Sequence, residues 1–126
     1  MNVINFEEAI IELSKKIPKG KYKYVYGIPR GGLVIAVYFS HLLKLEFIDE
    51  YGRRYLEEDN HPQILVVDDI AHTGKTLKHY HNWYDTATIF YKPKTSEIKP
   101  TYYLFEIEEW VDFPYELDSD EPNRDY

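Results

Sequence analysis

Apolar residues recur along the chain in two patterns, the three-to-four-residue spacing of amphipathic helices and the short unbroken runs of buried strands. Helical spacing covers residues 5–16 and stops at Pro18 and Gly20. A second helix is expected to open in the glycine-rich loop at residues 27–32 and to run to about Leu43, and a third covers residues 77–84. Strands are expected at residues 22–26, 45–48, 64–67, 86–91 and 102–107. This alternation predicts an α/β domain in three layers, with a mainly parallel sheet of about five strands between helices.

Residues 49–62 interrupt the alternation with a charged, aromatic stretch that has no clean periodicity. Its length and polarity suit a mobile lid over a site. An ordinary solvated connection explains the same features equally well.

Composition narrows the class of protein. A chain of 126 residues forms one domain, which we place at residues 1–117, and the acidic residues 118–126 are expected to form a flexible tail. Without cysteine there is neither a disulfide framework nor a thiolate zinc site. The net charge of −7 argues against general nucleic-acid binding. No signal peptide and no apolar run of membrane-spanning length is visible, so a cytoplasmic protein without a membrane partner is expected.

The strongest candidate for chemistry follows the apolar run at residues 64–67. Asp68 and Asp69 come next, then a loop with Thr73, Gly74 and Thr76, and then the helical segment. Glycine, converging loop amides and a helix N-terminus are the parts of a phosphate site, and carboxylates beside a phosphate suit the hydroxyl groups of a sugar. A nucleotide-binding P-loop is excluded because it requires glycine at position 69. An ordinary capped strand-to-helix turn is the structural alternative.

Three further features become better evidence for a ligand site when they are considered together with this motif. The first strand is followed by Arg30, Gly31 and Gly32, which form a second potential anion site. Such a loop alone is more often a tight turn. Lys92 follows the strand at residues 86–91, where open α/β sheets bind ligands. Trp110 lies in the aromatic segment at residues 109–116 and suits either the core or stacking on a planar base.

The apolar strand, acidic pair and Thr-Gly-x-Thr loop resemble the signature of the type I phosphoribosyltransferases, which bind 5-phosphoribosyl 1-diphosphate (PRPP). The resemblance implies that Asp68 and Asp69 hold the ribose, that Arg30, Gly31 and Gly32 hold the diphosphate, and that a non-proline cis peptide bond joins Arg30 to Gly31. It implies that the 5-phosphate is held by Ala71, His72, Thr73, Gly74, Lys75 and Thr76.

Lys92 and the aromatic segment around Trp110 resemble features of the bacterial xanthine-guanine phosphoribosyltransferases. This implies that Lys92 meets the 6-oxo group of a purine, that Trp110 with Val111 holds the base, and that the C-terminal segment forms a small hood. His72 stands where the family usually has an aspartate that exchanges a proton with the base. Histidine is able to fill that catalytic role beside Asp68 and Asp69, or it merely caps the loop.

The implied activity is transfer of 5-phosphoribosyl from PRPP to xanthine, guanine or hypoxanthine, giving a nucleoside monophosphate and diphosphate in purine salvage. The implied cofactor is Mg²⁺, carried mainly by PRPP and water-bridged to Asp68 and Asp69. A homodimer or homotetramer is the implied assembly. The alternative is a regulatory protein that binds PRPP or a nucleotide with little or no transferase activity.

Overall fold

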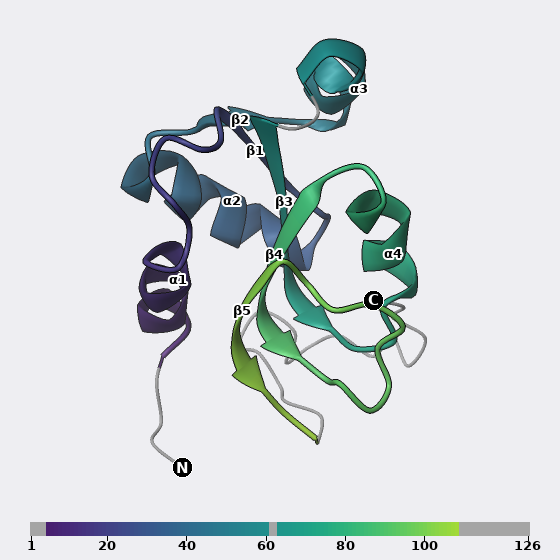
Figure 1. Ribbon diagram of the computed structural model, residues 1–126. Coiled ribbons are helices and arrows are strands. Elements are labelled where there is room, and N and C mark those ends of the chain that lie inside the picture. The colour runs from purple at the N-terminus through teal and green to yellow at the C-terminus, as the bar shows by residue number, and fades with distance from the viewer. Residues whose placement is uncertain (1–4, 61–62, 109–126) are drawn as a thin grey trace.

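The computed structural model describes residues 5–60 and 63–108, which form one α/β domain (Figure 1). The sheet has five parallel strands in the order β2-β1-β3-β4-β5, which confirms the predicted sheet. The elements in chain order are α1 (Phe6–Ser14), β1 (Tyr24–Gly27), α2 (Gly31–Leu42), β2 (Glu46–Ile48), α3 (Glu50–Asn60), β3 (Ile64–Ala71), α4 (Lys75–His81), β4 (Asp85–Tyr91) and β5 (Tyr102–Glu106).

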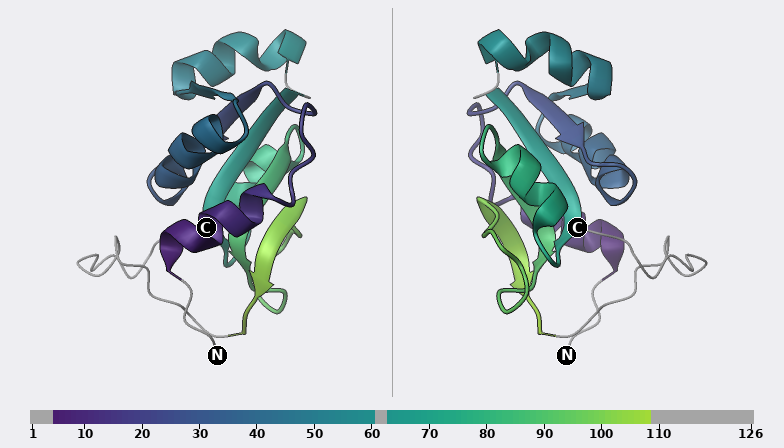
Figure 2. Two further views of the ribbon diagram at one scale, coloured as in Figure 1. Left: turned by 90° about the vertical axis from the view of Figure 1, so that its left-hand side faces the viewer. Right: turned by 90° about the vertical axis from the view of Figure 1, so that its right-hand side faces the viewer.

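Helices cover both faces of the sheet, as Figure 2 shows from its two sides. On one face, α1 and α2 bury a core that includes Ile10, Leu13, Ile35 and Phe39. On the other face, a second core forms around Leu77 of α4. Strand β3 lies in the middle of the sheet and is buried along its whole length, as its unbroken apolar run predicts. Within the described ranges, no helix is both long and apolar enough to cross a bilayer.

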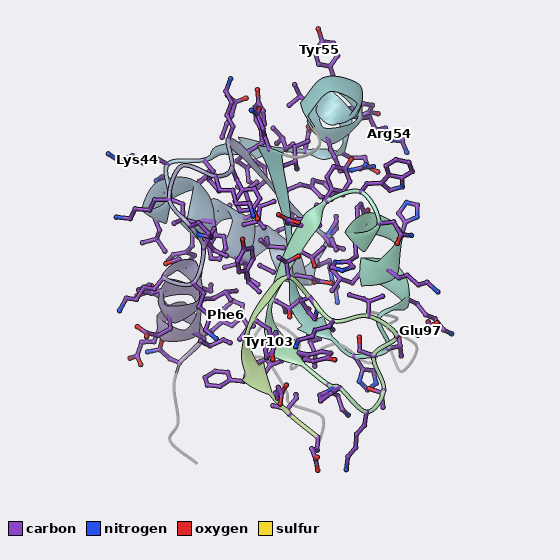
Figure 3. All side chains as sticks on the ribbon, viewed as in Figure 1. Phe6, Lys44, Arg54, Tyr55, Glu97 and Tyr103 are labelled. Carbon is purple, nitrogen blue, oxygen red and sulfur yellow. The ribbon has the colours of Figure 1, made fainter. Side chains whose placement is uncertain are left out.

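The expectation of a loop at residues 49–62 is wrong, because most of this stretch forms α3. Asp49 caps the first turn, since its carboxylate accepts a hydrogen bond from the amide of Gly52 at 2.8 Å. Tyr51 and Tyr55 are 83% and 88% exposed, and Figure 3 shows Tyr55 pointing away from the molecule. The helix instead buries the side chain of Arg53, so no apolar periodicity marks it.

Arg53 anchors α3 to the domain through a set of aromatic rings. Its guanidinium carbon lies 5.4, 5.2 and 5.9 Å from the ring centroids of Tyr26, Tyr80 and Tyr84. It donates to the Tyr84 hydroxyl at 3.1 Å and pairs with Glu50 at 2.6 Å. Burial alone would lower the pKa of Arg53, but the hydrogen bonds with Tyr84 and Glu50 raise it above its ordinary value.

Strand β3 continues beyond the residue at which the sequence predicts its end. Asp68 and Asp69 lie within the strand, which runs on to Ala71. Pairing with β4 passes from Asp68–Thr88 directly to Ile70–Phe90. At this interruption, the carboxylate of Asp69 accepts a hydrogen bond from the amide of Ile70, in place of a ladder partner.

Some expectations fall on residues that the structure does not describe. Trp110, Val111, the C-terminal hood and the acidic tail at residues 118–126 all lie outside the described residues.

Candidate functional site

The predicted site residues from residue 30 to residue 92 come together at one edge of the sheet. In a parallel sheet, the carboxyl ends of all strands lie at the same edge, so the loops after β1, β3 and β4 are neighbours. In Figures 1 and 2, α3 lies at the opposite end of β3, where that strand begins. In this arrangement α3 does not act as a lid over the three loops.

The loop after β1 is held directly on β3. The amide of Ile28 donates to the carbonyl of Val67 at 3.0 Å, and the amide of Gly32 donates to the carbonyl of Ile28 at 2.8 Å. The cis peptide bond joins Pro29 to Arg30, so the predicted bond between Arg30 and Gly31 is wrong by one position. Arg30 is exposed at the N-terminus of α2, where an arginine suits an anionic ligand.

Gly31 brings this loop against the acidic pair. A Cβ atom at Gly31 would lie 2.5 Å from Cγ of Asp69, a distance that real Cβ atoms do not show. Only a glycine therefore lets the first turn of α2 approach the carboxylate this closely. The contact joins the loop after β1 to the acidic residues of β3.

The two carboxylates lie on opposite faces of the sheet. Val67 packs in the core beneath α1 and α2, and Asp69 lies against Gly31 at the N-terminus of α2. Asp68, between them in the sequence, therefore points to the face that α4 covers. Both side chains are fully buried, and each carboxylate accepts a 2.8 Å hydrogen bond from the next backbone amide. Each hydrogen bond holds one oxygen, Oδ1, of its carboxylate.

The loop after β3 turns at Gly74, whose φ of +80° favours glycine. The side chain of Thr73 accepts a hydrogen bond from the amide of Lys75 at 3.3 Å. Lys75 is exposed as the first residue of α4, and Thr76 follows it half-buried in the same turn. Loop amides, a threonine hydroxyl and a lysine are suited to a phosphate group.

A brace that sequence reasoning missed supports this loop. Residues 95–97, which follow β4, contact it: Thr95 donates to the carbonyl of His72, and the amide of Glu97 donates to the carbonyl of Thr73 at 2.8 Å. A Cβ atom at Gly74 would lie 2.7 Å from Oγ of Ser96. The only signal in the sequence is the cluster of hydroxyl residues soon after Pro93, which by itself indicates a turn.

Lys92 lies beside the same loop. Its amide donates to the carbonyl of Ala71 at 3.0 Å, and only 8% of the residue is exposed. Ala71 itself is the last residue of β3 and is buried, whereas the side chain of His72 is half-buried. A largely buried lysine at the carboxyl end of a strand is unusual enough to suggest a ligand or a specific partner.

Comparison with known proteins agrees with this geometry. The chain is 29% identical over 120 residues to a xanthine-guanine phosphoribosyltransferase from Cereibacter sphaeroides, and the match covers 78% of this chain and 71% of the relative. The crystal structure of a purine phosphoribosyltransferase from Pyrococcus horikoshii is also 29% identical, with a TM-score of 0.68 and coverage of 86% of this chain and 87% of that chain.

The chain is therefore similar in sequence and in fold to purine phosphoribosyltransferases. No protein-family model matches it. The fold is also similar to that of a hypothetical protein from Neisseria gonorrhoeae whose crystal structure holds bound ppGpp. That likeness has a TM-score of 0.70 at 19% identity and covers 94% of this chain and 90% of that chain.

Proposed function

We propose that the protein transfers 5-phosphoribosyl from PRPP to a 6-oxopurine and so contributes to purine salvage. The observation that supports this proposal is the contact between Gly31 and the Asp69 carboxylate. If the loop binds an anion and the carboxylate binds a sugar, this contact lets one ligand reach both. A ligand that fits both parts carries a sugar and a diphosphate. PRPP has both, together with a 5-phosphate for the loop after β3.

Each part of the PRPP molecule has a candidate partner. Arg30, Gly31 and Gly32 hold the diphosphate, and Asp68 and Asp69 accept hydrogen bonds from the ribose hydroxyls. The loop of residues 71–76 holds the 5-phosphate through its amides and the hydroxyls of Thr73 and Thr76. The brace from residues 95–97 supports this role because it fixes the loop before a ligand arrives.

The base side of the site rests on Lys92 and His72. The Lys92 ammonium donates to the 6-oxo group, and the low exposure of this residue supports a specific partner. His72 follows β3 directly, and its half-buried imidazole accepts the proton that leaves the five-membered ring of the purine. Trp110 and Val111 are proposed to contact the base on the strength of the sequence resemblance.

Magnesium fits this site as a companion of the diphosphate. Among the residues that the structure describes, no three His, Cys, Asp or Glu side chains gather into a metal site. The carboxylates of Asp68 and Asp69 are oxygen donors that suit the water ligands of Mg²⁺. When bound, Mg²⁺ neutralises charge on the diphosphate leaving group.

In the reaction, the bond between C1 of the ribose and the diphosphate oxygen breaks, and its electron pair leaves with the diphosphate. The lone pair of a purine ring nitrogen forms the new bond to C1, and the proton of that ring system passes to His72. The protein contributes position and charge: the two loops hold the reacting atoms in line, and the carboxylates face a sugar that becomes positively charged.

A second function has specific support. A protein that senses PRPP or a nucleotide would keep both loops, and it would need neither a lid nor the usual family aspartate at position 72. The Neisseria gonorrhoeae neighbour with bound ppGpp shares the fold. Against this reading stands Lys92, because a sensor of PRPP alone has no use for a base pocket.

The substitution Asp69→Asn tests the proposal. Asparagine keeps the acceptor for the amide of Ile70 and changes little in shape, so the fold should survive. We expect turnover with PRPP to fall at least about 100-fold, since a preorganised charge at the reacting sugar is lost. The thermal unfolding midpoint is the control. Retained turnover in a folded variant would contradict the role of Asp69.

A further inference from the structure

Thr88 carries a buried hydroxyl for which the fold itself supplies no partner. The residue lies in the middle of β4 and is 0% exposed. Within the described part of the chain, its Oγ1 atom makes no hydrogen bond. An unpaired buried hydroxyl destabilises a protein, and valine would fill the same space in a strand without this penalty. A hydroxyl at this place therefore requires an explanation.

The strand pairing places Thr88 beside Asp68. The two residues are register partners in the parallel pair of β3 and β4. Ala87 and Ile89, which flank Thr88, both pack in the core beneath α1 and α2, so Thr88 points to the opposite face. Asp68 points to this same face. Neighbouring strands lie about 4.8 Å apart, so the hydroxyl and the carboxylate belong to adjacent side chains on one surface.

The other polar neighbours of Thr88 on β4 and β5 already form hydrogen bonds with other residues. Thr86, the previous residue on this face of β4, shares a 2.9 Å hydrogen bond with Nδ1 of His81 and accepts another from the amide of Thr101. Tyr103 is the register partner on β5, and its hydroxyl donates to Glu106 at 3.0 Å. Of these described strand neighbours of Thr88, Asp68 is the one that belongs to the proposed ligand site.

We infer that Thr88 is a positioning residue for Asp68. When a nucleotide or PRPP binds, the Thr88 hydroxyl donates a hydrogen bond to the Asp68 carboxylate and holds it toward the ribose hydroxyls. The hydroxyl then has its partner in the bound protein, and the ribose meets a carboxylate of fixed orientation. This inference rests on the proposed function, because it requires a ribose at Asp68.

Two variants at position 88 and one control variant test the inference. Thr88→Val removes the hydroxyl and keeps the shape of the side chain, whereas Thr88→Ser keeps the hydroxyl. Thr86→Val is the matched control, since it removes a hydroxyl from the same face of the same strand, but one that is already hydrogen-bonded. Calorimetric titration is done with GMP and with 2′,3′-dideoxyguanosine 5′-monophosphate, which lacks the two ribose hydroxyls. The comparison separates binding through these hydroxyls from binding through the base and the phosphate.

For Thr88→Val we expect binding of GMP to weaken about tenfold, while binding of the dideoxy nucleotide stays within about twofold of the unmodified protein. Its thermal midpoint should rise, because an unpaired buried hydroxyl is gone. Thr88→Ser should bind GMP almost normally. Thr86→Val should lower the midpoint and leave the ratio between the two nucleotides unchanged.

Failure of the inference and failure of the proposed function would give different results. Unchanged GMP binding by Thr88→Val, or an equal loss for both nucleotides, would overturn the inference and leave the proposed function standing. If the unmodified protein bound neither nucleotide and also failed to bind PRPP with Mg²⁺, the proposed function would be contradicted, and the inference with it.

Discussion

Gly31 and Asp69 lie so close together that the Asp69 carboxylate occupies the space that the Cβ atom of any other residue at position 31 would need. A Cβ atom at position 31 would lie 2.5 Å from both Cγ and Oδ2 of Asp69. This contact couples the start of α2 to the central strand. The loop that we assign to the diphosphate and the strand residues that we assign to the ribose therefore form one unit.

Replacement of Gly31 by alanine should consequently damage the site more than the fold. The added methyl group forces the Asp69 carboxylate or the turn before α2 to move, so we expect PRPP affinity to fall at least about tenfold by calorimetry. Gly20→Ala is the control: its φ of +82° makes alanine unfavourable by about 1 kcal/mol, but no atom lies within 4 Å of the added Cβ. That variant should lose stability and keep its affinity. Equal affinities in the two variants would argue against the coupling.

Arg53 should matter more to stability than its neighbour Arg54. Only 8% of the Arg53 side chain is exposed, and it pairs with Glu50 and Tyr84, whereas 70% of the Arg54 side chain is exposed. Arg53→Met keeps much of the volume but removes the guanidinium hydrogen bonds to these partners, so unfolding in urea should show a loss of about 2–4 kcal/mol. Arg54→Met should change the free energy of unfolding by less than about 0.5 kcal/mol. Similar values for the two variants would show that the ring cluster does not hold α3.

Tyr22 gives the fold a dependence on alkaline pH. Its hydroxyl donates to Asp85 at 2.5 Å and contacts the hydroxyl of Tyr102 at 2.8 Å. Burial, followed by these hydrogen bonds, raises the pKa of Tyr22 well above the ordinary value of 10.0. Above pH 10 the unfolded chain releases this proton while the folded protein retains it, so this contribution to stability is complete below pH 10 and is lost as the pH rises further.

Urea unfolding at about pH 8 and about pH 11 measures this effect. The protein should lose stability between the two values, and Tyr22→Phe should lose less over the same interval, although it is the less stable protein at pH 8. Tyr55→Phe is a useful control, because the Tyr55 side chain is exposed and points away from the molecule. An identical pH dependence in the unmodified protein and Tyr22→Phe would contradict the assignment.

The sequence predicts the sheet well because its central strands are buried on both faces and therefore read as largely apolar runs. Ile64–Val67 and residues 86–91 are the clearest cases, and the glycine loops after β1 and β3 follow from local chemistry alone. The cis peptide bond is predicted in the right loop but one bond too late.

Other features depend on contacts between distant residues. Helix α3 escapes prediction because, among its residues 50–56, the buried side chain is Arg53, which contacts rings from β1, from α4 and from Tyr84 just before β4. Strand β3 runs through Asp68 and Asp69, whose carboxylates accept hydrogen bonds from backbone amides. Residue propensities for strand or turn do not predict such hydrogen bonds. The brace at residues 95–97 depends likewise on a contact with the loop more than twenty positions earlier.

The measurement that tests the central claim most directly is a Mg²⁺-dependent assay of the purified protein with PRPP and, in turn, xanthine, guanine, hypoxanthine and adenine. Formation of nucleoside monophosphate and diphosphate is followed with each base. The proposed function predicts turnover with at least one 6-oxopurine and little or none with adenine, which lacks the oxo group that Lys92 contacts. No turnover with any base, together with calorimetric binding of PRPP or a nucleotide, would contradict transferase activity and favour the sensor.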